Sequence, residues 1–137
     1  MVDPPAAYLD ASALLKLIVD EPGSAELRGW LTPDVRIVMS RVGAIELVRA
    51  VRRLRRDLEN ETSAVLSAVD LVELDAELAA DAGVLVPVTL RTFDAIHIAT
   101  AIRLRAAVPT FVAYDARLLA AARENGLRTA SPGVDLL

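Results

Sequence analysis

The chain has 137 residues, of which 54% are hydrophobic and 25% charged, as expected for a globular protein with one core. Cysteine is absent and histidine occurs once, which excludes disulfides, zinc sites built on Cys and His, and thiol nucleophiles. Any metal ion must therefore be held by oxygen ligands, which favour Mg²⁺ or Mn²⁺. The formal net charge of −4 argues against a protein that coats nucleic acid through a basic surface.

The N-terminal stretch is not typical of a secreted or membrane protein. MVDPPAAYLD has an acid and two prolines where a secretory signal has basic residues and then an apolar block. No apolar run approaches the roughly 18 residues of a membrane span. We therefore expect a cytoplasmic protein with no membrane contact, and a single domain over residues 1–137.

Short runs rich in β-branched, aromatic and aliphatic residues predict five strands. They lie at residues 6–9, 35–39, 71–74, 110–114 and 128–130. Apolar residues with helical spacing predict helices between the strands. These residues are Ala11, Leu14, Leu15 and Ile18; Leu27, Trp30 and Leu31; Leu47, Val48, Val51, Leu54 and Leu58; and Ala95, Ile98, Ala99 and Ile102. A helix is also expected after residue 115, and the aromatic residues are interpreted as packing residues. The alternation indicates an α/β fold with a parallel sheet covered on both faces.

Acidic residues stand where the predicted strands end and the helices begin. Asp10 and Asp115 each follow a strand and open a helix, and Asp94 lies in a first helical turn behind Thr92, the expected cap. Glu46 lies about one and a half turns into the helix after the second strand. Singly, each acid is a good cap or surface charge. Because ligands of open parallel sheets bind beyond the carboxyl ends of the strands, the four meet in one cleft if the first and fourth strands are neighbours.

Four carboxylates in one cleft would take up protons near neutral pH unless a cation joined them. Mg²⁺ or Mn²⁺ held by carboxylates activates water and stabilises charge on a phosphoryl group, so the acids predict metal-assisted phosphodiester hydrolysis. Other phosphate chemistries lack their residues. Ser12 stands where a haloacid-dehalogenase phosphatase has its second aspartate, and Lys16, the only lysine, is misplaced for a response-regulator receiver. No GxxxxGK[ST] run indicates a P-loop.

The acids lie in the segments YLDASALLKL, SRVGAIELVRA, FDAIHIATA and FVAYDARLLAAARENGL. Their order and separation resemble the PIN-domain family, most closely the VapC toxins of bacterial toxin–antitoxin pairs, over essentially the whole chain. The resemblance implies a PIN-like three-layer α/β/α fold with a central parallel sheet of four to five strands. It also implies a metal-dependent endoribonuclease acting on single-stranded or looped RNA, such as tRNA, rRNA or mRNA.

The resemblance places four acids in one catalytic and metal-binding site: Asp10, Glu46, Asp94 and Asp115. Asp10 and Asp94 are expected to bind Mg²⁺ (or Mn²⁺) directly, and Asp115 to complete the site. Glu46 would position or deprotonate the attacking water, directly or through the metal.

Three further residues are expected to support these acids. Ser12 matches a small hydroxyl residue of the family motif and could bond to a carboxylate, a water or a phosphate; the alternative is a simple hydroxyl in the first helical turn. Ser40, at the end of the second strand, is a weaker candidate of the same kind. His97 is expected to pack or to support the acids, not to act as the base.

Arginines recur on the helix of Glu46 at Arg49, Arg52, Arg53 and Arg56. This arginine stripe is a solvated face, an edge that contacts phosphates, or a surface for an acidic partner. Arg49 and Arg53 are the candidates for RNA contacts. The resemblance further implies a homodimer and a cognate VapB-like antitoxin whose C-terminal segment crosses the cleft.

Two other functions remain open from the sequence. The first is a non-catalytic PIN-fold binding module, against which the four mutually repelling carboxylates argue. The second is a PIN-type DNA nuclease, against which the short chain argues because the duplex-binding enzymes of that superfamily carry extra helical segments.

Overall fold

The computed structural model describes residues 5–136. Five strands form one parallel sheet in the order β3-β2-β1-β4-β5. Their bounds in chain order are β1 Ala6–Leu9, β2 Arg36–Ser40, β3 Val69–Val72, β4 Thr110–Val112 and β5 Arg128–Ala130. The helices are α1 Ala11–Lys16, α2 Ser24–Trp30, α3 Arg41–Leu54, α4 Glu59–Ser67, α5 Ala76–Gly83, α6 Thr92–Leu104 and α7 Ala116–Glu124, with a 3₁₀ turn at Arg56–Leu58.

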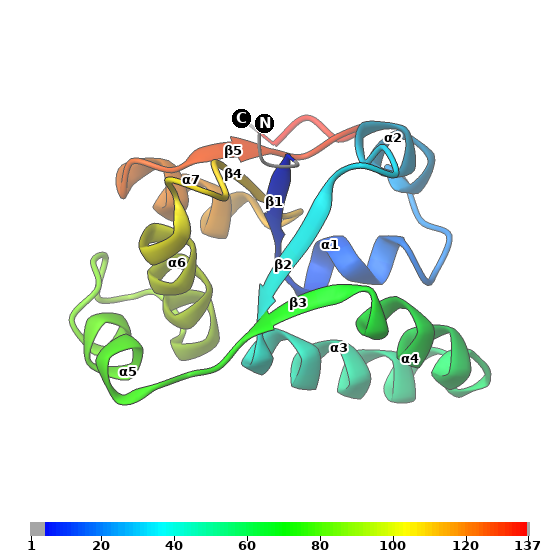
Figure 1. The fold of residues 1–137 in the computed structure, drawn as a ribbon, viewed down its shortest axis with the longest axis horizontal. Coiled ribbons are helices and arrows are strands. Elements are labelled where there is room, and N and C mark those ends of the chain that lie inside the picture. The colour runs from blue at the N-terminus through cyan, green and yellow to red at the C-terminus, as the bar shows by residue number, and fades with distance from the viewer. Residues whose placement is uncertain (1–4, 137) are drawn as a thin grey trace.

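The helices cover the sheet on both sides. Figure 1 shows α1 to α4 on one side of the sheet and α5 to α7 on the other. This is the result of right-handed crossovers, since the chain moves outward from β1 to β3 and then returns past β1 to β4 and β5. The predicted three-layer α/β/α fold is therefore confirmed. Within residues 5–136, none of the helices combines the length and apolar character needed to cross a bilayer.

The central strand β1 fixes the position of the site. All four of its residues are buried, and Tyr8 pairs in register with Val38 on β2 and Phe111 on β4. The rings of Tyr8 and Phe111 are stacked, with centroids 5.3 Å apart. Strands β1 and β4 are neighbours, as the convergence of the acids requires. The residues that follow them therefore lie side by side at the carboxyl ends of the strands.

The strand bounds differ from the predicted ones mainly at the sheet edge. β1 and β5 match, β2 begins one residue later, β4 ends at Val112, and β3 occupies Val69–Val72 where 71–74 was predicted. Strand β3 pairs on one side only, and its Asp70 faces solvent, where it forms an ion pair with Arg36 at 3.0 Å. An edge strand with a charged outer residue lacks the continuous apolar run by which we located the central strands.

Two aromatic side chains are more exposed than predicted. Trp30 is 38% exposed and Phe93 is 48% exposed, so neither belongs to the core. Leu58, assigned to the long helix on its spacing, lies in the 3₁₀ turn that follows α3. Each of these residues keeps helical spacing, but spacing alone does not show whether a neighbouring element covers it.

The first turn of α3 packs unusually close to the centre of the molecule, at Gly43. A Cβ atom at this position would lie 2.6 Å from Sδ of Met39 and 2.7 Å from Cε1 of His97. Gly43→Ala is therefore expected to lower the free energy of unfolding by about 1–3 kcal/mol through overpacking. Urea unfolding measures this change.

Gly29→Ala is the matched control, because Gly29 is also helical and nothing lies within 4 Å of the position that an added methyl group would occupy. There the substitution is expected to be neutral or stabilising by about 0.5–1 kcal/mol, since alanine is the better helix former. Equal effects at the two glycines would contradict the close approach at Gly43.

Candidate active site

Asp10 follows β1 and caps α1. Its Oδ1 accepts hydrogen bonds from the backbone N–H of Ala13 at 3.0 Å and from the hydroxyl of Ser12 at 2.6 Å. The Oγ of Ser12 in turn accepts the N–H of Tyr114 at 3.0 Å. Ser12 thus links the ends of the first and fourth strands, and it bonds to a carboxylate, one of the partners predicted for it.

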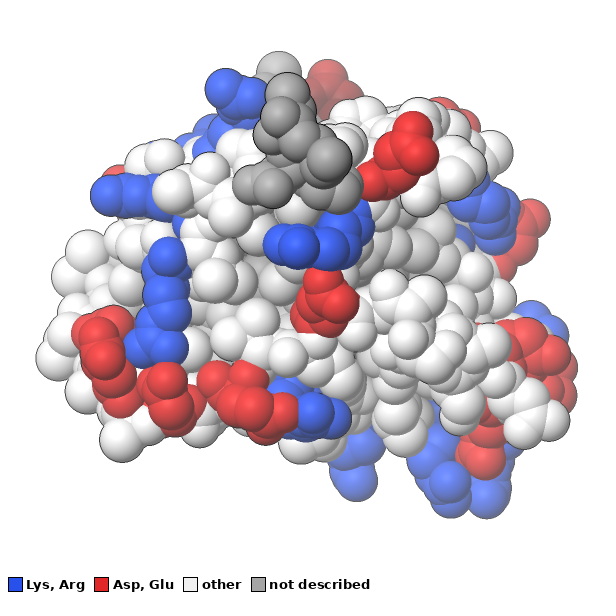
Figure 2. Space-filling model, viewed as in Figure 1, with Lys and Arg blue, Asp and Glu red and all other residues white. Residues whose placement is uncertain are grey.

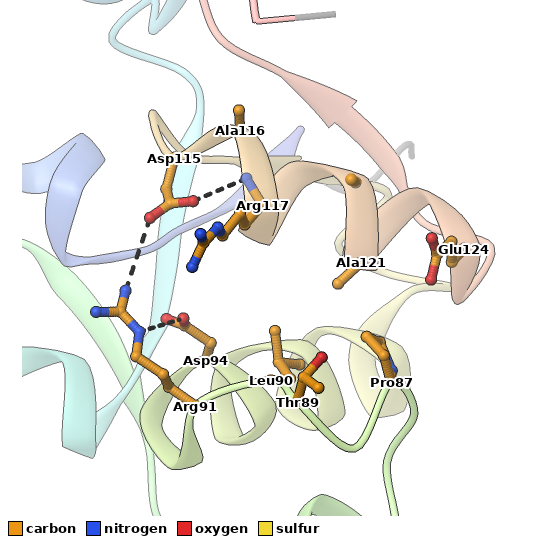
Figure 3. A pocket seen from close by; sticks show the side chains of 11 residues that line it. Pro87, Thr89, Leu90, Arg91, Asp94, Asp115, Ala116, Arg117, Ala121 and Glu124 are labelled. Atoms are coloured by element: carbon orange, nitrogen blue, oxygen red, sulfur yellow. Dashed lines mark hydrogen bonds and ion pairs between the residues drawn. The ribbon is translucent and has the colours of Figure 1, made fainter.

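Asp94 and Asp115 are joined by an arginine that the sequence interpretation missed. Asp115 caps α7, with its Oδ1 accepting the N–H groups of Arg117 and Leu118. Nε of Arg91 donates to Oδ2 of Asp94 at 3.2 Å, and Nη2 of Arg91 lies 3.6 Å from Oδ2 of Asp115. Figure 3 shows the guanidinium between the two carboxylates. The structure therefore brings these two acids to one cation.

The helix cap expected at Thr92 was wrong. Arg91 is the N-cap residue of α6, without a side-chain capping bond, and Thr92 is the first helical residue. The Arg91 side chain instead reaches back to Asp94 in the first turn. The spacing of three residues between them was the available signal, since residues i and i+3 lie on the same side of a helix.

Glu46 is held by a buried chain of hydrogen bonds. Its Oε1 lies 2.6 Å from Nε2 of His97, and Nδ1 of His97 lies 2.6 Å from the hydroxyl of Tyr8. The N–H of Ser40 donates to that hydroxyl oxygen at 3.0 Å. The Tyr8 hydroxyl therefore gives its one hydrogen to Nδ1. An imidazole that accepts this hydrogen at Nδ1 carries its own hydrogen on Nε2 and donates it to Glu46.

The side chain of His97 is 1% exposed and contacts Glu46, one of the acids that it is expected to support. The part played by Tyr8 was not predicted. Tyr8 lies two residues before Asp10 on a strand, so the two side chains point to the same face of the sheet. That alternation was the signal that could have identified Tyr8.

The buried position of Asp10 disfavours its negative charge. Burial raises the pKa of Asp10 to about 6, and the charge of Glu46 adds to this effect. Positive charge on a protonated His97 ring opposes the effect, as do the hydrogen bonds from Ser12 and Ala13. A buried carboxyl without a cation favours its protonated form. Asp10 and Glu46 are thus close enough to act on each other's charge.

Arg91 connects the remaining acids in the same way. Asp94 raises the pKa of Arg91, and Asp115 and Glu46 contribute further in the same direction. All four predicted acids therefore belong to one group of interacting charges, in which Glu46 acts on Asp10 and on Arg91, and Arg91 pairs with Asp94 and Asp115.

The carboxylate oxygens of this group are suitable ligands for a divalent ion, although the side chains do not converge on a common point. Within residues 5–136, no set of three Asp, Glu or His side chains stands close enough to hold one ion. The carboxylates of Asp94 and Asp115 face the guanidinium of Arg91 instead. A cation therefore already lies between two of the acids, and carboxylates are the ligands that Mg²⁺ and Mn²⁺ prefer.

A cleft of about 890 Å³ opens beside Asp94 and Asp115. It runs between α7 and the segment that precedes α6 (Figure 3). Leu90 and Ala121 give it apolar walls, and Arg117 lines it together with the two acids. Asp10 and Glu46 are not among the lining residues. The cleft therefore approaches the acids from the side of α6 and α7.

The other predicted residues lie apart from the acids or have a structural task. The hydroxyl of Ser40 caps α3 by accepting the N–H of Val42 at 3.2 Å. Arg49 and Arg53 are exposed on α3, and Arg52 of the arginine stripe forms an ion pair with Glu59 at 3.1 Å. A contact of Arg49 or Arg53 with RNA stays a prediction.

Comparison with known proteins identifies the family of the chain. The PIN domain family profile matches residues 7–124. Ribonuclease VapC47 of Mycobacterium tuberculosis is 40% identical over 131 residues, covering 92% of this chain and 96% of that protein.

Two solved structures share the fold. VapC20 of Mycobacterium tuberculosis, a sarcin-ricin loop cleaving toxin, has a TM-score of 0.67 at 16% identity, covering 84% of this chain and 94% of that chain. A toxin–antitoxin complex from Klebsiella pneumoniae gives a TM-score of 0.66 at 19% identity, covering 83% and 90% respectively. By its profile match and its VapC relative, the chain belongs to the PIN domain family and is of the VapC ribonuclease type.

Proposed function

We propose that this chain is a metal-dependent endoribonuclease that acts as the toxin of a type II toxin–antitoxin system. The observation that carries the proposal is the grouping of four acids as interacting charges: Asp10 and Asp115 after β1 and β4, Glu46 on α3 and Asp94 on α6. The similarity to VapC ribonucleases supports RNA as the substrate. The site chemistry supports hydrolysis of a phosphodiester bond.

Each acid has a distinct part in the proposed reaction. Asp10, Asp94 and Asp115 would hold Mg²⁺ or Mn²⁺, which supplies an activated water and neutralises charge on the phosphate when bound. Glu46 would position the attacking water and accept its proton. The hydrogen bond from Nε2 of His97 fixes one oxygen of Glu46, which leaves the other free to face the water.

The partners follow from the same similarity. The structural likeness to a toxin–antitoxin complex supports a VapB-like antitoxin that would cover the acids and so inhibit the toxin. We also propose a homodimer and a cytoplasmic location. The substrate would be single-stranded or looped RNA, whose unstacked bases and bendable backbone can enter a cleft.

Digestion of RNA with controlled metal content tests the proposal. The purified protein is expected to cleave single-stranded RNA with Mg²⁺ or Mn²⁺ and to lose this activity when a chelator is added. Activity that survives the chelator would contradict the metal dependence. Tight RNA binding without products under either metal would favour a binding module, and cleavage of DNA flaps in preference to RNA would favour a DNA nuclease.

A further inference from the structure

Arg91 is an unusual residue for its position in α6. The N-terminus of a helix carries partial positive charge, so a cation there is disfavoured, and the usual N-cap residues are Ser, Thr, Asp and Asn. The Arg91 side chain makes no capping bond. Capping of α6 therefore does not explain the presence of an arginine, whereas its contacts with Asp94 and Asp115 do.

The ion pairs of Arg91 are weak enough for another cation to replace the guanidinium. Its side chain is 77% exposed, its hydrogen bond to Asp94 measures 3.2 Å, and its approach to Asp115 measures 3.6 Å, longer than a hydrogen bond. Exposed ion pairs with this geometry contribute little stability. By contrast, Asp94 is only 15% exposed and is fixed in the first turn of α6. The carboxylates are therefore anchored, while the guanidinium is free to move.

Arg91 also lines the cleft, where it is accessible to a phosphate group. Arg91 and Arg117 both line this space next to the acids, and Figure 3 shows the Arg117 guanidinium on the side of the cleft where Arg91 and Asp94 lie. Several other arginines are paired with carboxylates, as in Arg41 with Glu73 and Arg103 with Asp75. Figure 2 shows acidic and basic side chains mixed over the face in view. The cleft therefore offers a phosphate two guanidinium groups, those of Arg91 and Arg117, beside the carboxylates of Asp94, Asp115 and Glu124.

We propose that Arg91 is an exchangeable internal cation: it neutralises Asp94 and Asp115 in the metal-free protein and turns to an RNA phosphate in the cleft when a divalent ion takes its place. The inference rests on the proposed function. It explains why two of the expected ligands face a guanidinium and not one another. It also makes metal binding and RNA binding mutually supportive, since the ion releases the residue that contacts the phosphate.

Metal affinity gives the first test, with Mn²⁺ alone as the probe. Calorimetric titration of the metal-free protein is expected to show about fivefold tighter Mn²⁺ binding for Arg91→Ala than for the wild type, because a competing cation is removed. Arg91→Gln is expected to behave in the same way. Arg103→Ala is the matched control, since it removes the same charge from the same helix but pairs with Asp75 and Glu77; its Mn²⁺ affinity should stay within about twofold.

RNA affinity gives the second test and has the opposite sign. With Mn²⁺ present, Arg91→Ala is expected to bind a cleavage-resistant phosphorothioate RNA about fivefold more weakly than the wild type. Without metal the two proteins should bind this RNA equally, because the wild-type arginine is then occupied by Asp94 and Asp115.

The outcomes separate this inference from the proposed function. If the wild type binds Mn²⁺ and cleaves RNA but Arg91→Ala binds Mn²⁺ no more tightly, only the inference is overturned. The same holds if the variant weakens RNA binding equally with and without metal. A wild type that neither binds Mn²⁺ nor cleaves RNA overturns the proposed function and the inference together.

Discussion

Asp10→Asn is expected to reduce RNA cleavage by a factor of at least about 100 while leaving the protein folded. Asparagine keeps an Oδ1 atom that can accept the hydrogen bonds from Ser12 and Ala13. It loses the negative charge that would bind the divalent ion. The measurement is the initial rate of RNA cleavage at saturating Mg²⁺ or Mn²⁺, with circular dichroism to confirm folding.

Asp75→Asn is the matched control for this loss. Asp75 also caps a helix, α5, by accepting the N–H of Leu78 at 2.8 Å, but it pairs with Arg103 away from the acids. Cleavage by this variant should remain within about twofold of the wild type. If Asp10→Asn cleaves as well as Asp75→Asn, Asp10 does not hold the catalytic metal.

The same substitution is expected to stabilise the metal-free protein above pH 6. The pKa of Asp10 is raised to about 6 by burial, so the folded state binds more protons than the unfolded state between about pH 4 and pH 6. Stability therefore falls as the pH rises through this window, by up to about 3 kcal/mol. The Asp10→Asn variant has no carboxyl group to ionise at this position, so its stability does not fall in this way as the pH rises.

Urea unfolding at pH 4 and pH 8 with a chelator present measures this difference. Asp75→Asn should instead be less stable than the wild type at both pH values, because the hydrogen bond from Arg103 lowers the pKa of Asp75 and the stabilisation by its charge is largely present already at pH 4. Parallel pH profiles for the wild type and Asp10→Asn would contradict the raised pKa. A gain in stability coupled to a loss of activity is expected at a site that keeps a buried charge for function.

The sequence predicted those parts of the site that depend on local structure. Asp10 and Asp115 each follow a central strand and cap a helix, so their placement at one edge of the sheet follows from the strand order. Helices α4 and α5 escaped prediction because they carry few buried apolar residues, with Thr62 and Leu78 the buried ones. Long apolar patterns are readable from sequence, whereas short polar helices depend on their caps and neighbours.

What the sequence did not predict arises where distant elements cross. Glu46 lies on α3 and His97 on α6, and they meet only because Gly43 lets the two helices approach. Likewise, the capping position of Arg91 is local, but its reach to Asp115 depends on how α7 sits beside α6. Pairwise contacts of this kind are set by tertiary packing, to which neither periodicity nor capping preference is sensitive.

Tyr8→Phe is expected to lower kcat about tenfold with little change in KM, although the residue touches no substrate. Without the Tyr8 hydroxyl, Nδ1 of His97 has no donor, and the imidazole is free to adopt the other tautomer. Its Nε2 would then present a lone pair to Glu46, and the carboxylate would lose the hydrogen bond that holds it. ¹⁵N NMR of the imidazole reports this change directly, since it distinguishes a protonated from an unprotonated ring nitrogen.

Two substitutions of His97 separate positioning of Glu46 from packing. The side-chain nitrogen of His97→Gln replaces Nε2 and can still donate to Glu46, so kcat should stay within about threefold of the wild type. In His97→Asn the side-chain nitrogen of asparagine takes the place of Nδ1 and does not reach Glu46, so kcat should fall about tenfold or more. Urea unfolding of both variants provides the control for packing, because both remove the buried ring. Equal kcat values for the two would mean that His97 only fills space, whereas rescue by glutamine alone requires the hydrogen bond from Nε2 to the Glu46 carboxylate.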